Sequence, residues 1–373
     1  MTCPGPGPRA AVFAFGRVRT LVESADPSHL AWLDEFLTPQ FERRRDLDHE
    51  FRVRLVEDGA EYRSAHALGP ATGTADAFAH DTEVVSLPRW RGGPMRLLDA
   101  RLELLYDVGA GAVTILSAPG NSRIRLALMR VVREIATNRA QAAGGLLLHS
   151  AAFTAEGRGV LIAGQKRAGK TTLLLHMLGA GGAHYVSNDR VLVATDGAAP
   201  PGARGVPTIV ALRPGTLDFF PAIAARLAAT CHRYRLTLDE AAALRRQGAS
   251  RAPGGVSPAQ LCWLLGARAA GECELGAILF PRITGAPGAI AARRLDEVAA
   301  ASRLAGALFG LAHGRSTSDV FPARGGETAP DLGARTARAH ALAARVPCFD
   351  CELGLGAYGS ASTAGALIES VLG

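Results

Sequence analysis

Eight consecutive residues near the middle of the chain have the types and spacing needed to bind phosphate. Residues 164–171 fit the pattern G-x-x-x-x-G-K-S/T. In such a loop, glycines let backbone N–H groups turn inward around a phosphate at the positive end of a helix dipole. The lysine, here Lys170, reaches the β- and γ-phosphates, and the Thr171 hydroxyl is placed to ligate Mg²⁺. The predicted nucleotide site consists of Gly164, Gln165, Lys166, Arg167, Ala168, Gly169, Lys170, Thr171 and Thr172.

The use of lysine supports this interpretation. Lys166 and Lys170 are the chain's two lysines, so 41 − 2 = 39 of its basic residues are arginines. A phosphate-loop lysine acts as a compact point charge, whereas arginine is a planar fork, so lysine is not the default choice here. In this composition, about 0.003 chance matches to the pattern are expected. The pattern therefore favours a phosphate-binding loop over an ordinary glycine turn between strand and helix.

Three further polar residues stand at the ends of apolar strands. Asn188 and Asp189 follow the short strand of 185–187, and in a phosphate-loop protein an acidic residue there can lie beside Mg²⁺. A β-turn is the alternative, since Asn-Asp is good turn chemistry. His149 ends an earlier strand, where a site role and a hydrogen-bonded structural histidine both remain open.

His149, the loop 164–171 and the Ser187-Asn188-Asp189 stretch, in this order and at these separations, resemble the kinase core of the HPr kinase/phosphorylase family and its relatives. The resemblance covers roughly residues 144–212. It implies transfer of the γ-phosphoryl group of ATP to a serine hydroxyl of a protein or peptide. It also implies that Asp189, His149 and Lys170 are catalytic, and that Thr171 and Asp189 hold Mg²⁺.

The sequence departs from the family pattern at three positions. Arg167 replaces a glycine usual in the loop, which bears on how the loop closes over the phosphates. Asn188 replaces the first acidic residue of a pair, so proton abstraction falls to Asp189 or His149. Gly202 stands where a later stretch of the family, represented here by Arg204-Gly205, has a metal-ligating carboxylate. The family's reverse reaction, dephosphorylation, is therefore not expected.

The function expected from these residues is that of an ATP-dependent kinase acting on a serine or threonine hydroxyl of a peptide or protein. Two alternatives remain open: a regulatory switch that binds and hydrolyses ATP, and a small-molecule kinase built on the same core. A motor ATPase is disfavoured, because the chain lacks a long apolar strand ending in Asp-Glu. Arg282 and the Arg293-Arg294 pair are candidates for a cation at the γ-phosphate.

The elements around the motif predict an α/β fold, with a P-loop nucleotide-binding core of HPr-kinase type and a smaller strand-rich N-terminal region. Residues 1–120 form that region, with 41–46 as a solvated segment, and residues 121–373 form the kinase-like α/β domain with its core at 144–212. A helix is expected over 123–142. Strands are expected at 51–56, 101–107, 112–116, 146–149, 159–163, 183–193, 206–212 and 277–280, with a helix from 172 onward.

Composition sets broad limits on partners and compartment. The net charge is 41 − 34 = +7, but the arginine skew resembles a whole-sequence bias, so no nucleic-acid partner is expected. No apolar run reaches the ~18 residues of a membrane helix, and residues 1–6 do not resemble a secretory leader. Six cysteines in 373 residues make no disulfide framework. We expect a cytoplasmic protein without membrane contact whose partner is a peptide or protein phosphoacceptor; whether it is a homo-oligomer stays open.

Overall fold

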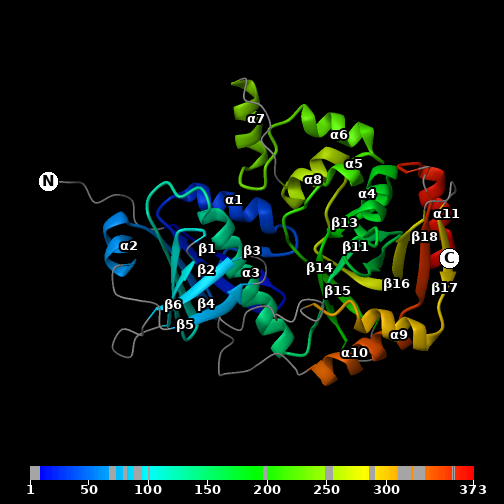
Figure 1. Cartoon of the computed structure of the whole chain (residues 1–373), viewed down its shortest axis with the longest axis horizontal. Helices are drawn as coiled ribbons and strands as arrows, with labels where there is room; N and C mark the ends of the chain where they lie inside the picture. The colour runs from blue at the N-terminus through cyan, green and yellow to red at the C-terminus, as the bar shows by residue number, and fades with distance from the viewer. Residues whose placement is uncertain are drawn as a thin grey trace. The chain divides into compact units, whose positions relative to one another are not determined.

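A computed structural model describes residues 9–66, 73–78, 82–87, 95–99, 101–195, 200–247, 255–284, 290–309, 321, 332–354, 356 and 358–373. The chain divides into two compact units (Figure 1). The first unit comprises Met1–Ala143 with His313–Ala329, and the second unit comprises Gly144–Ala312 with Pro330–Gly373. The first boundary falls after Ala143 rather than after residue 120, because the helix α3 (Ile124–Ala142) packs against strands of the first unit.

In the described residues of the first unit, nine strands form a mixed sheet with strand order β3-β1-β2-β4-β9-β8-β7-β6-β5. Helices α1 (Pro27–Leu37) and α3 contact each other and β2, so both cover the same face of the sheet. A further helix, α2 (Gly59–His66), contacts β8 and β9. The strands are β1 (Arg9–Phe15), β2 (Val18–Ser24), β3 (Glu42–Arg44), β4 (Phe51–Glu57), β5 (Gly73–Phe78), β6 (Thr82–Leu87), β7 (Met95–Asp99), β8 (Leu104–Gly109) and β9 (Ala112–Ser117).

The expectation of a solvated segment at 41–46 is wrong at its first residue. Phe41 is fully buried, and its ring centroid lies 4.7 Å from that of Phe15 in β1. The charged residues that follow are exposed, and three of them form the edge strand β3. An aromatic ring is thus buried at the start of a run that is otherwise charged, which composition alone does not reveal.

The second unit is a three-layer α/β assembly around a mixed sheet with strand order β10-β14-β15-β16-β12-β11-β13. Strand β18 pairs with β16, and β17 pairs with β18. The strands are β10 (Leu146–Leu148), β11 (Ser150–Ala155), β12 (Arg158–Ala163), β13 (His184–Ser187), β14 (Arg190–Ala194), β15 (Gly202–Val206), β16 (Glu272–Ile283), β17 (Ala291–Arg294) and β18 (Cys348–Leu353). The mixed α/β class predicted from the sequence is confirmed.

Alternation along the strands explains why helices cover both faces of this sheet. In β12, Val160 and Ile162 face one apolar cluster, while Leu161 and Ala163 face the other. The first cluster includes α4 (Lys170–Ala180), α6 (Pro221–Ala228), α8 (Pro258–Leu265) and α11 (Ala361–Leu372). The second includes α9 (Glu297–Ala305) and α10 (Leu332–Arg345), which lie side by side (Figure 1). Cys348 and Cys351 of β18 also face opposite clusters, so they do not face each other.

The strand predicted over 206–212 is wrong. Strand β15 ends at Val206, and Pro207 follows it. Proline has no N–H to donate to the ladder, so the chain leaves the sheet at this point. The following residues make one isolated bridge, between Val210 and Val256, before the short helix α5 (Pro214–Leu217). This departure from the sheet leaves the segment 207–213 available to line a pocket.

Among the described helices of the chain, none combines the length and the apolar composition needed to cross a membrane.

Candidate active site

Residues 164–169 form the loop between the end of β12 and the start of α4. Gly164 has φ +147° and Gly169 has φ +104°, values that L side chains rarely adopt. A Cβ on Gly169 would also lie 2.9 Å from Cγ1 of Ile283. Arg167, which is not a glycine, has φ +71° and is therefore in the left-handed region. The backbone at position 167 therefore has a conformation that favours glycine, although the residue there is arginine.

The Lys170 side chain lies folded within this loop. Its Nζ donates to the carbonyl oxygens of Gly164 at 2.7 Å and Gln165 at 3.1 Å. Burial lowers the pKa of Lys170, and the negative charge of Asp189 opposes that shift. The ammonium is thus held at the base of the loop by main-chain acceptors.

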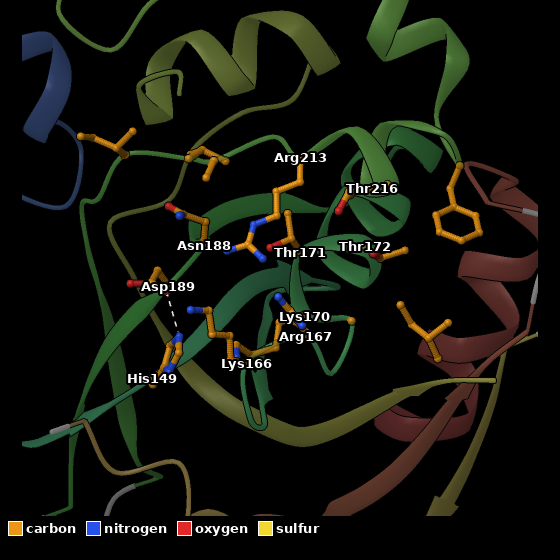
Figure 2. Close-up of a pocket in the computed structure, with 17 residues that line it drawn as sticks. His149, Lys166, Arg167, Lys170, Thr171, Thr172, Asn188, Asp189, Arg213 and Thr216 are labelled. Carbon is orange, nitrogen blue, oxygen red and sulfur yellow. Dashed lines mark ion pairs between the residues drawn. The ribbon is translucent and has the colours of Figure 1, made fainter. Parts of the chain in front are cut away.

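The loop opens into a pocket of about 470 Å³ that lies entirely within the second unit (Figure 2). Of the predicted loop residues, six line it, whereas Gly164, Gln165 and Ala168 do not. The described lining carries four cationic side chains and one carboxylate, that of Asp189. The lining residues are His149, Lys166, Arg167, Gly169, Lys170, Thr171, Thr172, Asn188, Asp189, Ile209, Val210, Ala211, Arg213, Gly215, Thr216, Phe219 and Ile283.

The structure brings His149 and Asp189 together at one end of this pocket. His149 directly follows β10, and Asp189 lies in the connection between β13 and β14. Nε2 of His149 lies 3.0 Å from Oδ1 of Asp189 (dashed in Figure 2). Strands β13 and β14 are not neighbours in the sheet, so Asn188-Asp189 is a crossing connection and not a hairpin turn. His149 and Asp189, both predicted as site residues, therefore contact each other in the same pocket.

Opposing effects act on the Asp189 carboxyl. Burial raises its pKa, but the hydrogen bond and charge of His149 and the charges of Arg190 and Lys170 lower it further, so that the pKa is about 2. Asp189 is therefore ionised at neutral pH. A carboxylate with so low a pKa is a weak base but a good counterion for an imidazolium or a metal ion.

Asn188 is held by two hydroxyl groups. Its Oδ1 accepts from the Tyr185 hydroxyl at 2.7 Å and from the Thr208 hydroxyl at 3.2 Å. Because the side-chain oxygen already accepts two hydrogen bonds, the side-chain nitrogen is the atom of Asn188 that can bond to a molecule in the pocket. An amide nitrogen is only a donor, so Asn188 cannot take a proton from a substrate.

Phe309 supports the His149 end of the pocket and was missed by sequence reasoning. Its ring lies 6.3 Å from that of His149, edge to face, and the Arg190 guanidinium carbon lies 4.1 Å from its centroid. The Phe309 N–H donates to the Leu147 carbonyl at 2.9 Å. An apolar residue after a helix gives no signal beyond core packing, so only the structure reveals this contact.

The cations predicted to reach the γ-phosphate lie elsewhere. Arg282 pairs with Glu352 across β16 and β18, and Arg293 and Arg294 lie on β17; none of the three lines the pocket. These predictions are therefore not supported by the position of the side chains. Arg204 pairs with Glu272, which also leaves it outside the pocket lining. Arg213, which sequence reasoning did not single out, lines the pocket instead.

The residues that line the pocket suit a nucleotide whose phosphates help to hold a metal ion. Main-chain acceptors and two left-handed glycines shape the loop around Lys170, and the Thr171 hydroxyl and the Asp189 carboxylate line the same pocket. Among the described residues, no group of three or more His, Cys, Asp or Glu is arranged to hold a metal ion. Mg²⁺ is commonly held by one or two protein oxygens together with substrate phosphates, which these residues allow.

Comparison with models of known protein families finds no match to this chain, and comparison with curated proteins finds none either.

Proposed function

We propose that the chain is an ATP-dependent kinase that transfers the γ-phosphoryl group to a serine or threonine hydroxyl of a peptide or protein. The observation that carries the proposal is the meeting, in one pocket, of the loop around Lys170 with the hydrogen-bonded pair His149 and Asp189. A phosphate-binding loop supplies the donor site, and a base beside it supplies a place for the acceptor hydroxyl.

The loop and its cations would bind the triphosphate. Lys170, released from the carbonyls of Gly164 and Gln165, would exchange those acceptors for phosphate oxygens. Lys166 and Arg167 add positive charge at the pocket lining. Thr171 and Asp189 would hold Mg²⁺, which supplies neutralisation of phosphate charge when bound.

The proton of the acceptor hydroxyl would pass to His149, with Asp189 as its ionised partner. The acceptor oxygen bonds to the γ-phosphorus, the bond from that phosphorus to the β–γ bridging oxygen breaks, and its electron pair leaves with ADP. If Nε2 of His149 carries the hydrogen donated to Asp189, the other ring nitrogen has a lone pair for the proton. The low pKa of Asp189 argues against that carboxylate as the proton acceptor.

A second candidate function is an ATP-hydrolysing regulatory switch. Asn188 favours it, because an amide stands where a carboxylate base would speed transfer to an alcohol. A small-molecule kinase on the same core is a third candidate. The destination of the phosphate (polypeptide, water or metabolite) distinguishes the three.

The test uses ATP labelled at the γ-phosphate, a library of serine- and threonine-containing peptides, and the full-length protein. We expect label in peptide. His149→Gln can keep a hydrogen bond to Asp189 but cannot accept the proton, so transfer should fall by ~10²–10⁴-fold with ATP binding retained. Label released to water at several per second without peptide would contradict the kinase proposal and support the switch. Transfer undiminished in His149→Gln would remove His149 from the proton step.

A further inference from the structure

The backbone that carries Arg213 is fixed on both sides. Before it, Val210 donates to the Val256 carbonyl at 2.9 Å and accepts from the Val256 N–H at 3.0 Å. After it, the Arg213 carbonyl accepts from the N–H groups of Thr216 and Leu217, both at 3.0 Å, at the start of α5. The side chain therefore starts from a defined point on the pocket wall opposite the loop.

The Arg213 side chain enters the pocket, and none of the described acidic residues pairs with it. It lines the cavity and points toward Thr171 and Asn188 (Figure 2). No carboxylate within the described parts of the chain lies within ion-pair distance of it. By contrast, Arg204, Arg282 and Arg303 each pair with an acidic side chain. A guanidinium aimed into a cavity with no carboxylate partner is suited to an anionic ligand there.

We propose that Arg213 is a catalytic residue that binds the phosphoryl group while it is being transferred. This inference rests on the proposed function, because it assumes ATP on the loop around Lys170. Arg213 points toward Thr171, the residue expected to hold Mg²⁺ and the chain neighbour of Lys170, which is expected to reach the β- and γ-phosphates. With ATP bound in this way, the guanidinium would face the group that moves. During transfer, negative charge lies on the three equatorial phosphoryl oxygens, and a planar fork of N–H donors can contact two of them.

The direction of the Lys166 side chain favours Arg213, and not Lys166, as the residue that contacts the transferred phosphoryl group. Lys166 comes from the loop itself and its side chain points toward His149 and Asp189, the end where the acceptor would enter (Figure 2). Lys170 lies at the base of the loop, on the carbonyls of Gly164 and Gln165. Among the described cationic residues that line the pocket, Arg213 comes from the wall opposite the loop. Its guanidinium can therefore contact the transferred group from the side that the loop does not reach.

The experiment measures binding of ADP with and without aluminium fluoride, which mimics a phosphoryl group in transit, in the presence of Mg²⁺. In the wild-type chain, aluminium fluoride should tighten ADP binding. In Arg213→Ala, we expect ADP affinity to be unchanged and the tightening to fall by ~10²-fold or more. Arg213→Lys should recover part of it, since an ammonium keeps the charge but not the fork. Arg246→Ala, an exposed arginine on α7 (Leu238–Arg246) outside the pocket, is the control.

The outcomes distinguish the role of Arg213 from the proposed kinase function. Equal tightening in Arg213→Ala and the wild type would overturn the role of Arg213 while leaving the kinase proposal in place. An equal loss of ADP affinity and of tightening would also overturn it, because Arg213 would then bind the ground state. A wild-type chain that binds no ADP would overturn the proposed function itself. Circular dichroism and thermal melting of both Arg213 variants show whether either has unfolded, and Arg213→Gln replaces an unfolded alanine variant.

Discussion

At the residue scale, the pocket pairs an ionised carboxylate with a side chain that can take up a proton. Asp189, with a pKa of about 2, stays charged at neutral pH, and His149 lies 3.0 Å away. Asn188, which accepts from two hydroxyl groups, places a neutral side chain next to this pair. Such an arrangement suits phosphoryl transfer, in which positioning and charge neutralisation supply most of the rate and a base supplies a smaller part.

Backbone strain at Arg167 gives a prediction about stability. Arg167 has φ +71°, where a Cβ costs about 1 kcal/mol relative to glycine. We expect Arg167→Gly to be more stable than Arg167→Ala by about 1 kcal/mol, because both variants lose the long side chain but only alanine keeps the Cβ. Urea unfolding of the two variants measures the difference. Equal stabilities, or a more stable alanine variant, would contradict a left-handed backbone at this position.

The glycine-lysine pattern predicted the residues of the loop. A polar residue at a strand end left His149 and Asp189 open between a site role and a structural one, and the resemblance to a kinase family favoured the site role. The sequence could not predict Arg213, because 39 arginines look alike without knowledge of which one faces a cavity. One local signal was available, since Pro207 ends β15 and turns the following segment out of the sheet. Phe309 had no comparable signal.

At the element scale, α4 joins the loop to the C-terminal part of the second unit. His176 of α4 is fully buried, and its Nδ1 accepts from the Gly359 N–H at 2.7 Å. The ring lies edge to face with Tyr358, 5.9 Å between centroids, and Tyr358 in turn lies 5.0 Å from Phe219 of the pocket lining. The helix that begins with Lys170 is therefore anchored by a buried imidazole six residues, or about 1.7 turns, further on.

This buried histidine predicts a loss of stability in mild acid. Burial lowers the pKa of His176 from about 6.5 to about 4. The unfolded chain therefore binds a proton that the folded chain does not between these values, so stability falls as pH drops from about 6.5 toward 4 and changes little from this source below that. The loss is on the order of 3 kcal/mol.

His176→Gln provides the matched comparison, because its side-chain oxygen can still accept from Gly359 but does not titrate. Urea unfolding of both proteins at pH 7 and pH 4.5 gives the measurement. We expect the wild type to lose more stability than the variant over this interval. The same loss in both proteins would show that the pKa of His176 is not lowered and that His176 is protonated in the folded chain at pH 4.5.

Elements with a strong periodic signal were predictable, and those set by pairing partners were not. The helix expected at 123–142 is α3 within one residue, since its apolar positions recur at helical spacing. The strand expected at 206–212 failed because proline removes a ladder donor. The strands β1 and β2 and the helix α1, within residues 9–37, were not predicted, although most of their apolar residues are buried.

At the scale of the whole molecule, every described residue of the pocket belongs to the second unit. The first unit gains a residue from far along the chain: Phe321 is fully buried, its ring lies 5.9 Å from that of Tyr106, and its carbonyl accepts from the Asn138 side chain at 3.3 Å. A chain that returns to its first unit after leaving it gives no local pattern, which is why the sequence predicted two consecutive domains.

The most direct test of the account is equilibrium binding of ATP to the whole protein in the presence of Mg²⁺, compared with Lys170→Ala. We predict that the wild type binds ATP, and that the variant, folded by circular dichroism, binds it at least ~10²-fold more weakly, because in the proposed site the lost ammonium would contact the β- and γ-phosphates. Lys166→Ala, in the same loop, should weaken binding less. A folded Lys170→Ala that binds ATP as tightly as the wild type, or a wild type that binds none, would contradict the phosphate-loop site on which the proposed function depends.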